Sequence, residues 1–580
     1  MKRFPFLFTC VVLISGLYAQ NPTGKVNTKY LRPSITMLFS QPKDADEEVV
    51  ISKFRNLEVN SKFDNHKIDF PDLAPIDPLN LQKNALITKY IRAASNPVIA
   101  KWWGRDADGN FNYSLVAQRG SYTATDADAI ISRGSNTSRI EMIGEQLIDK
   151  SYILLYEITD LYSMEEYYDR QDASNRKLKI TTPVKRTEEG YNCDYKVYAY
   201  KVDFTDSVAS EFYSRYWVDV KNHDNKKVAA WADAQFPVRL MASTGGSVRS
   251  AQSKQKTLNT KKKTMRELLE DIPAEIQNNA VFELGRKIED FRLKVTVFKA
   301  YPVSAKLGTK EDLYIDQRFY VYEIEQEKNG NQKINRKGVV RVKTINDNKQ
   351  VATGSSLPSV FQQVAGGRIY QGMFMESKDD YGIILNIGKN GSANNAMDGF
   401  NLGADFRISR FLKKPGWHFG IDASLRSMKD VYAGNISTPL QPSLINSTEL
   451  VSGGTYAIAV NISKESYFTR KGNVYLRPLV GLGLQSYSFN NIGGSEIDSE
   501  NKDYSWSSIY VPAGIGVGWN ITPTFSLEMK PGVYARFAAT TGNKEKLTQS
   551  AAPVTDNWGF GTIDKMNFGT TNTICLRIRF

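Results

Sequence analysis

The residues from Tyr381 to Phe580 alternate between apolar and polar side chains. In an extended strand this period of two places all apolar side chains on one face. Charged side chains fall on the opposite face only, so the apolar face must meet surroundings that exclude charge. Eight segments follow the pattern: 381–387, 400–408, 417–425, 456–462, 474–484, 509–519, 525–537 and 568–580.

The polar face of these predicted strands carries both carboxylates and basic side chains. A soluble barrel or sandwich keeps its charges outside, whereas an apolar exterior around a charged interior requires lipid. The alternative is a soluble closed barrel of the lipocalin kind. An eight-stranded barrel is just wide enough for side chains to fill it, so we expect the charges to pair rather than line a pore. The alternative is that the excess of basic side chains in the lumen binds an anion or bridging waters. The expected lumenal network is Asp405, Arg407, Asp422, Arg426, Arg477, Glu528, Lys530, Arg536, Arg577 and Arg579.

The connectors between the predicted strands alternate in length. Long links at 388–399, 431–454, 490–504 and 540–566 are rich in Asn, Ser, Gly and Asp, and short links at 413–416, 469–473 and 520–524 carry Pro or Gly. Outer-membrane barrels have short periplasmic turns and longer outside loops. The outward aromatic residues form two predicted interface belts. Phe400, Tyr456, Phe537 and Phe568 belong to the outer belt, and Tyr381, Trp417, Trp519, Phe525 and Phe580 to the inner belt.

With its alternation, its loop asymmetry and its terminal Phe580, the last third of the chain resembles the small eight-stranded outer-membrane β-barrel proteins of Gram-negative bacteria. In that family a terminal aromatic residue, preceded by apolar residues at alternate positions such as Ile574, Leu576 and Ile578, is read by the barrel-insertion machinery. The resemblance implies an architecture and a location, and it implies no activity.

The beginning of the chain predicts export. Residues 1–19 read as a signal peptide, with Lys2 and Arg3 before an apolar core and Ala19 at the exit. Cys10 lies inside that core without a lipobox, and a disulfide between Cys193 and Cys575 is not expected. The net charge of +13 is spread along the chain. Without a nucleic-acid-binding motif, it favours contact with anionic lipid or a wall polymer over nucleic acid.

The region between leader and barrel predicts two folded parts and a linker. Residues 20–240 form an α+β domain, with strands expected at 49–54, 98–103, 113–118, 151–159 and 195–204 and helices at 79–93 and 141–147. Residues 241–263 have six basic residues and no acid, which predicts a flexible linker or, as the sharper reading, a basic contact to wall polymer or headgroups. In the module 264–377, Thr264 and Glu267 form a capping box, Pro273 interrupts the helix, and a compact barrel or open sheet follows. Residues 378–580 form the barrel. The fold class is thus an α+β periplasmic region followed by a C-terminal eight-stranded antiparallel transmembrane β-barrel.

The residues with catalytic or metal-binding chemistry favour structural roles. None of His66, His223 and His418 stands in a zinc motif, and His418 is expected at the periplasmic end of the third strand. The segment 106–110 resembles a calcium loop but misplaces its glycine, which favours a turn. Glu165, Glu166 and Asp169 are expected on a solvated surface.

These patterns favour a non-enzymatic outer-membrane protein without a cofactor, whose barrel anchors a periplasmic module that binds an envelope protein or a cell-wall polymer. The expected partners are also outer-membrane lipid and the barrel-insertion machinery, with no nucleic acid. The first alternative is a surface-binding, adhesin-like barrel that acts through its long loops, and the last is a membrane-embedded hydrolase. The sequence indicates no oligomeric state.

Overall fold

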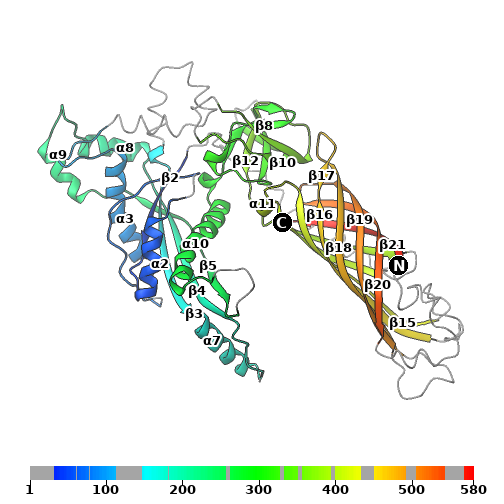
Figure 1. Cartoon of the computed structure of the whole chain (residues 1–580). Helices are drawn as coiled ribbons and strands as arrows, with labels where there is room; N and C mark the ends of the chain where they lie inside the picture. Colours follow the sequence, from blue (N-terminus) through cyan, green and yellow to red (C-terminus); the bar gives the residue numbers. More distant parts are fainter. Residues whose placement is uncertain are drawn as a thin grey trace.

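The computed structural model describes residues 32–59, 62–77, 79–112, 147–180, 182–255, 262–326, 332–349, 356–392, 399–432, 450–490, 504–541 and 567–580. Three folded parts follow one another along the molecule (Figure 1). They are an N-terminal domain that ends at about residue 291, a small middle domain, and the C-terminal barrel. The predicted leader, 1–19, and the predicted elements at 113–118 and 141–146 lie outside the described residues.

The N-terminal domain is built on a five-stranded sheet with the order β2-β1-β3-β4-β5. Strand β1 runs parallel to β2 and β3, whereas β3, β4 and β5 are antiparallel. The long strand β5 forms one edge of the sheet. The strands are β1 (Ser34–Phe39), β2 (Asp64–Asn65), β3 (Ser151–Ser163), β4 (Glu188–Val202) and β5 (Val238–Ser253).

Helices cover both faces of this sheet, because β3 and β4 carry apolar residues on both sides. Ile153 and Leu155 pack with helix α3 (Lys83–Trp102) on one face. Tyr152 and Leu154 pack on the other face, in a core that helices α2 (Ala45–Asn56) and α10 (Met265–Lys287) help to build. The domain is therefore a helix–sheet–helix sandwich. Its shorter helices are α7 (Met164–Lys177), α8 (Asp206–Glu211), η1 (Phe212–Tyr216), α9 (Asn225–Ala230), η2 (Trp231–Asp233) and η3 (Glu289–Phe291).

The predicted linker at 241–263 is wrong for residues 241–253, which belong to β5 and pair with β4 along its length. An edge strand with one face open to water needs few apolar residues, and its Ser, Thr and Gly content therefore looked like a linker. The predicted boundary at 264 also fails. Helix α10 packs on the first sheet, so the N-terminal domain includes it.

The capping box at Thr264 and Glu267 is confirmed, but the predicted interruption at Pro273 is wrong, since α10 runs on through this residue. The apolar side chains Leu269, Ile272 and Ile276 keep both halves of the helix on the same core. The strands expected at 49–54 and 98–103 are also wrong. Both segments are helical, because their β-branched residues lie at the helical spacing that faces the sheet.

The middle domain is a small curled sheet with the order β6-β12-β9-β10-β11-β8-β7. Its first and last strands are two halves of one segment, 294–300, so the sheet closes on itself as the compact barrel that was one of the two expected forms. Phe319, Val321, Val340 and Val342 lie in its core. The elements are β6 (Lys294–Thr296), β7 (Lys299–Ala300), β8 (Val303–Ala305), η4 (Thr309–Glu311), β9 (Arg318–Gln326), β10 (Gln332–Thr344), β11 (Ser359–Gly366) and β12 (Phe374–Ser377).

The C-terminal domain is a closed antiparallel barrel of eight strands, as predicted. Sequential neighbours pair throughout, and β21 pairs with β13 to close the ring. The short β17 (Ser466–Tyr467) extends the sheet beside β18, and α11 (Ser409–Leu412) lies in a turn. The barrel strands are β13 (Ile383–Ser392), β14 (Gly399–Arg407), β15 (Trp417–Tyr432), β16 (Leu450–Lys464), β18 (Val474–Asn490), β19 (Tyr504–Asn520), β20 (Phe525–Thr541) and β21 (Asn567–Arg579).

The barrel wall is apolar outside and polar inside. In β16, Ile458, Val460 and Ile462 are 43–51% exposed, while Asn461 and Ser463 between and beside them are 2–3% exposed. This arrangement is inverted relative to a soluble barrel and is that of a transmembrane barrel. Of the helices that the structure describes, none has both the length and the apolar character needed to cross a membrane.

Candidate functional site

The turn-side half of the barrel lumen holds a dry ion-pair network centred on Arg577 of β21. Its guanidinium donates to Asp405 Oδ2 at 2.8 Å, to Glu465 Oε1 at 2.7 Å and to Glu528 Oε2 at 3.0 Å. Arg477 binds Glu528 through two nitrogens, at 3.1 and 2.6 Å, and reaches Asp405 at 3.3 Å. All five side chains are at most 4% exposed. Such charges are tolerated in a dry interior only when each has opposite charges and hydrogen bonds.

A second group lies further along the lumen. Lys530 donates to Asp422 Oδ2 at 3.1 Å, and Asn461 donates to the same oxygen at 2.9 Å. Both ions retain some solvent exposure. The side chains of Arg426 and Arg536, which were expected in the lumen, lie outside the described residues.

Two of the expected lumenal arginines lie at the end of the barrel instead of its middle. Arg579 donates to Asn520 and Ser526 at 2.9 and 3.0 Å. Arg407 leaves the lumen and pairs with Asp316 of the middle domain at 3.3 Å. This partner lies in another domain, so the strand pattern alone could not indicate it.

Large tyrosines fill the lumen because glycines stand opposite them. Tyr475 lies across from Gly518, where an added Cβ would collide with the tyrosine ring. Tyr534 lies across from Gly569 in the same way. The hydroxyl of Tyr475 donates to Glu528 at 2.9 Å. The lumen is therefore packed by side chains, as expected for this strand number.

The middle domain covers the end of the barrel that carries the short turns. The Gly416 amide donates to Asp316 at 2.8 Å, and Gln362 donates to the Tyr467 carbonyl at 3.3 Å. Asn520 donates to the Val364 carbonyl of β11. All three short turns, or the strand ends beside them, thus contact one domain, and the C-terminus lies at the same junction (Figure 1).

Helix α10 of the N-terminal domain also reaches the start of the barrel segment. Arg286 lies 3.9 Å over the Tyr381 ring, and Phe282 packs against the same ring at 6.1 Å. Tyr381 therefore contacts protein, although it is still half exposed.

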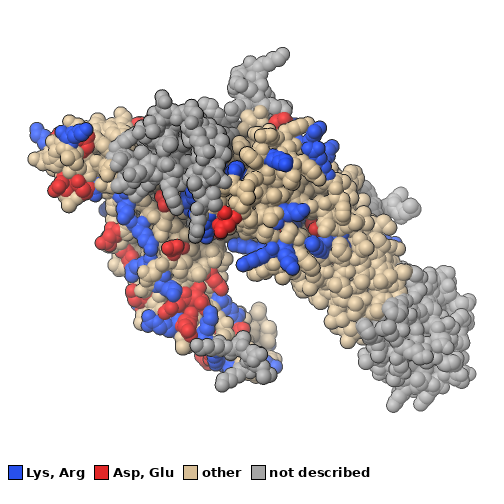
Figure 2. Space-filling view, turned by 45° about the horizontal axis from the view of Figure 1, so that its top comes forward, with Lys and Arg blue, Asp and Glu red and all other residues tan. Residues whose placement is uncertain are grey.

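The remaining belt residues point outward where their side chains are described. Phe400, Tyr456, Trp519 and Phe580 are 47–56% exposed, while Trp417 and Phe525 are half-buried. The side chains of Phe537 and Phe568 lie outside the described residues. Charged residues are sparse on the barrel wall that Figure 2 shows, whereas the N-terminal domain carries both signs.

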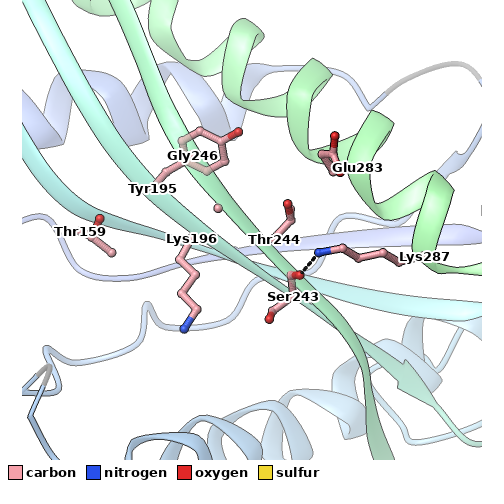
Figure 3. Close-up of a pocket in the computed structure, with 9 residues that line it drawn as sticks. Thr159, Tyr195, Lys196, Ser243, Thr244, Gly246, Glu283 and Lys287 are labelled. Atoms are coloured by element: carbon pink, nitrogen blue, oxygen red, sulfur yellow. Dashed lines mark hydrogen bonds between the residues drawn. The ribbon is translucent and has the colours of Figure 1, made fainter. Parts of the chain in front are cut away.

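A shallow groove of about 700 Å³ lies beside α10, lined by residues of β3, β4 and the edge strand β5. Gly245 and Gly246 form its floor, and Tyr195 packs over Gly246 (Figure 3). Lys287 crosses from α10 and donates to the Ser243 carbonyl at 2.6 Å, while Lys196 and Glu283 line the sides. Because β5 is the edge strand of the described sheet, an extended chain could add beside it through main-chain hydrogen bonds. The sequence does not indicate this groove, because the composition of its β5 segment predicts a linker.

The other candidate residues have structural partners. Asp106 caps its own turn by accepting from the Asn110 amide at 2.7 Å, as the turn reading predicted. Glu165 and Asp169 pair with Arg186 at the surface. His66 contacts the Val98 carbonyl, and His418 is buried at the turn end of β15. In the described ranges, no three His, Cys, Asp or Glu side chains are grouped to hold a metal ion. Cys193 and Cys575 are free and buried.

No protein-family model and no curated protein matches this chain. Among solved structures it is similar to a major outer membrane protein from Thermus thermophilus, at 11% identity over 34% of this chain and 98% of that chain, with a TM-score of 0.22. Neisserial surface protein A matches at 16% identity over 35% and 100%, with a TM-score of 0.21. Ail, the attachment invasion locus protein of Yersinia pestis, matches at 14% identity over 34% and 95%, with a TM-score of 0.19. The strand pairing and the outward apolar wall described above define the C-terminal domain as a small eight-stranded barrel of the outer-membrane type.

Proposed function

We propose that this chain is a non-enzymatic outer-membrane protein whose barrel anchors a periplasmic module that binds another component of the cell envelope. The observation that carries the proposal is the capping of one barrel end by the middle domain through Asp316, Gln362 and Val364. The N-terminal domain follows on from this cap, so both domains belong to the turn end of the barrel. In outer-membrane barrels the short turns lie in the periplasm.

The packed lumen supports an anchoring role over transport. A solute path would have to pass Arg577, Arg477 and their carboxylates, which are buried and bound to one another. Breaking such a network leaves uncompensated charge in a dry interior, which is strongly unfavourable.

The groove over β5 is the surface of the module that best suits a partner. Its edge strand and glycine floor fit an extended polypeptide, which can add to a sheet edge through main-chain hydrogen bonds. Lys196, Lys287 and Glu283 at its sides add charges that can select a sequence. An envelope protein with an extended segment therefore fits this groove better than a cell-wall polymer.

Labelling of intact cells with a membrane-impermeant thiol reagent tests the placement of the module. Two single variants are compared, Ser253→Cys at the exposed end of β5 and Ser443→Cys in the long link that lies outside the described residues. The background is low, because burial raises the pKa of Cys193 to about 12 and Cys575 is 2% exposed. Label on Ser443→Cys alone is expected. Label on Ser253→Cys would place the module outside the cell and favour the adhesin-like alternative.

Photo-crosslinking in intact envelopes tests the groove. A crosslinking amino acid at Lys196 is expected to yield a discrete protein adduct, whereas the same residue at the exposed Lys221, away from the groove, is not. Equal adducts at both positions, or an adduct at Lys221 alone, would show that the groove is not the binding site. The anchoring role would still be tested separately, by the labelling experiment.

A further inference from the structure

The short turns at the capped end of the barrel carry a concentration of positive charge. Turn 408–416 and turn 464–473 together contain six basic residues, here called the collar: Arg410, Lys413, Lys414, Lys464, Arg470 and Lys471. The one acid in these turns is Glu465, which is buried and bound by Arg577 at 2.7 Å. The exposed charge of the turns is therefore wholly positive.

The collar charges have no carboxylate partner among the described residues. Three of them lie over aromatic rings instead: Arg410 over Tyr314 at 4.6 Å, Lys464 over Trp417 at 5.9 Å, and Arg470 over Tyr301 at 5.0 Å. A cation held over a ring keeps its full charge and can still bind an anion. Figure 2 shows Lys and Arg gathered where the middle domain meets the barrel wall.

Large apolar side chains are exposed in the same turns. Phe411 is 85% exposed and Phe468 is 65% exposed, and Ile521 of the third turn is half exposed. The β7–β8 hairpin of the middle domain adds exposed Phe298 and Tyr301, and Arg470 joins this hairpin to the collar. Soluble surfaces do not usually present so many aromatic residues together. Exposed rings of the middle domain therefore lie beside the collar at Arg470.

We propose that the collar and the Phe298–Tyr301 hairpin bind anionic phospholipid headgroups of the membrane leaflet on the turn side. Lys and Arg side chains attract anionic headgroups, and interleaved aromatic side chains settle at headgroup depth. An acidic protein would satisfy the charges but leave Phe411 and Phe468 in water, whereas a lipid leaflet covers both. The middle domain then rests on the bilayer as well as on the barrel end, which fixes its tilt against the membrane.

The test uses the full chain reconstituted in phosphatidylcholine vesicles with or without phosphatidylglycerol. An environment-sensitive fluorophore is attached at Lys299→Cys in the hairpin and, as a control, at Ser253→Cys in the N-terminal domain. Nitroxide-labelled headgroups should quench the fluorophore at 299 and not at 253. Phosphatidylglycerol should increase the quenching at 299 by at least about twofold, because the collar charges concentrate anionic lipid.

Neutralising the collar separates charge recognition from simple proximity. The variant Lys413→Gln, Lys414→Gln, Arg470→Gln and Lys471→Gln should lose the phosphatidylglycerol dependence while its barrel still folds. A matched variant with Lys89→Gln, Arg92→Gln, Lys177→Gln and Lys221→Gln on the N-terminal domain should keep that dependence. No quenching at 299 in any vesicle would overturn the proposal. So would quenching that ignores both phosphatidylglycerol and the collar variant, and so would displacement of the hairpin by an acidic peptide at physiological salt.

Discussion

Among the lumenal side chains that the structure describes, Arg577 contacts the largest number of carboxylates. It contacts Asp405, Glu465 and Glu528, and it also donates to Asn386 at 3.0 Å. Lysine could not replace these contacts, because its single ammonium lacks the planar fork of donors. The arginine therefore determines the geometry of the lumen as well as its charge.

Replacing Arg577 by Ala should destabilise the folded barrel by about 3–5 kcal/mol, because buried carboxylates lose their partner. The temperature at which the heat-modifiable gel band unfolds is expected to fall, and Arg577→Lys should lie between that variant and the natural chain. Lys389→Ala, at an exposed position of β13, is the control and should unfold like the natural chain. Equal midpoints for Arg577→Ala and Lys389→Ala would mean that the lumen is wet.

The alternation of side chains along each strand predicts which charges face the lumen. Four of the predicted residues do lie together there: Asp405, Arg477, Glu528 and Arg577. This alternation could not indicate Glu465, which lies beyond the end of β16. Nor could it find Tyr475, whose hydroxyl donates to Glu528 in addition to the two arginines. Asp316 is more than ninety positions from Arg407, and only the fold brings the two together.

One buried carboxylate, Asp316, makes two of the contacts between the middle domain and the barrel turns, with the Gly416 amide and with Arg407. Burial raises the pKa of this carboxyl, but Arg407 and Arg341 outweigh that effect and hold the pKa below its usual value of 3.8. A carboxyl with a lowered pKa stabilises the fold above its unfolded value and loses that contribution as the pH falls through the folded value. The joint should therefore be intact at pH 7 and at pH 5, and it should loosen only below about pH 4.

Hydrogen-exchange protection of segment 408–416 measures the state of this joint. Protection is expected to be equal at pH 7 and 5 and to fall at pH 3 in the natural chain. Asp316→Asn should lose protection already at pH 7, at a cost of a few kcal/mol, because Arg407 is left without its partner. Asp347→Asn, in an exposed loop of the same domain, should behave like the natural chain. Unchanged protection in Asp316→Asn would mean that the contacts of Gln362 and Asn520, and not that of Asp316, hold the middle domain on the barrel turns.

Elements with an unambiguous period were predictable from the sequence, and those with mixed signals were not. All eight barrel strands follow from alternation, since each has one face in lipid and one in the lumen. In helix α2 the run Val49, Val50 and Ile51 is β-branched, but the core contacts of the helix outweigh that preference. Strand β5 could not be predicted because it lacks a clear pattern: an edge strand can be polar along most of its length.

At the scale of the whole molecule, the packed lumen predicts a protein that does not conduct ions across a membrane. Full-length protein in planar bilayers should show no steady conductance. The isolated segment 378–580 should also be silent, because the seal consists of side chains within the barrel and the middle domain only covers its end. Stable conductance steps from the full chain would contradict the packed lumen. Conductance steps from the isolated segment but not from the full chain would mean that the middle domain, and not the lumenal side chains, seals the barrel.

The pairing of β21 with β13 closes the ring between the first and the eighth strand of the barrel. The same strand carries Arg577, so without β21 the acids Asp405 on β14 and Glu528 on β20 would share Arg477 of β18 as their arginine partner among the described residues. A barrel in which β21 is not docked would have two open strand edges and too few positive charges for its buried acids. Ring closure and charge pairing in the lumen are therefore completed together, by the docking of one strand.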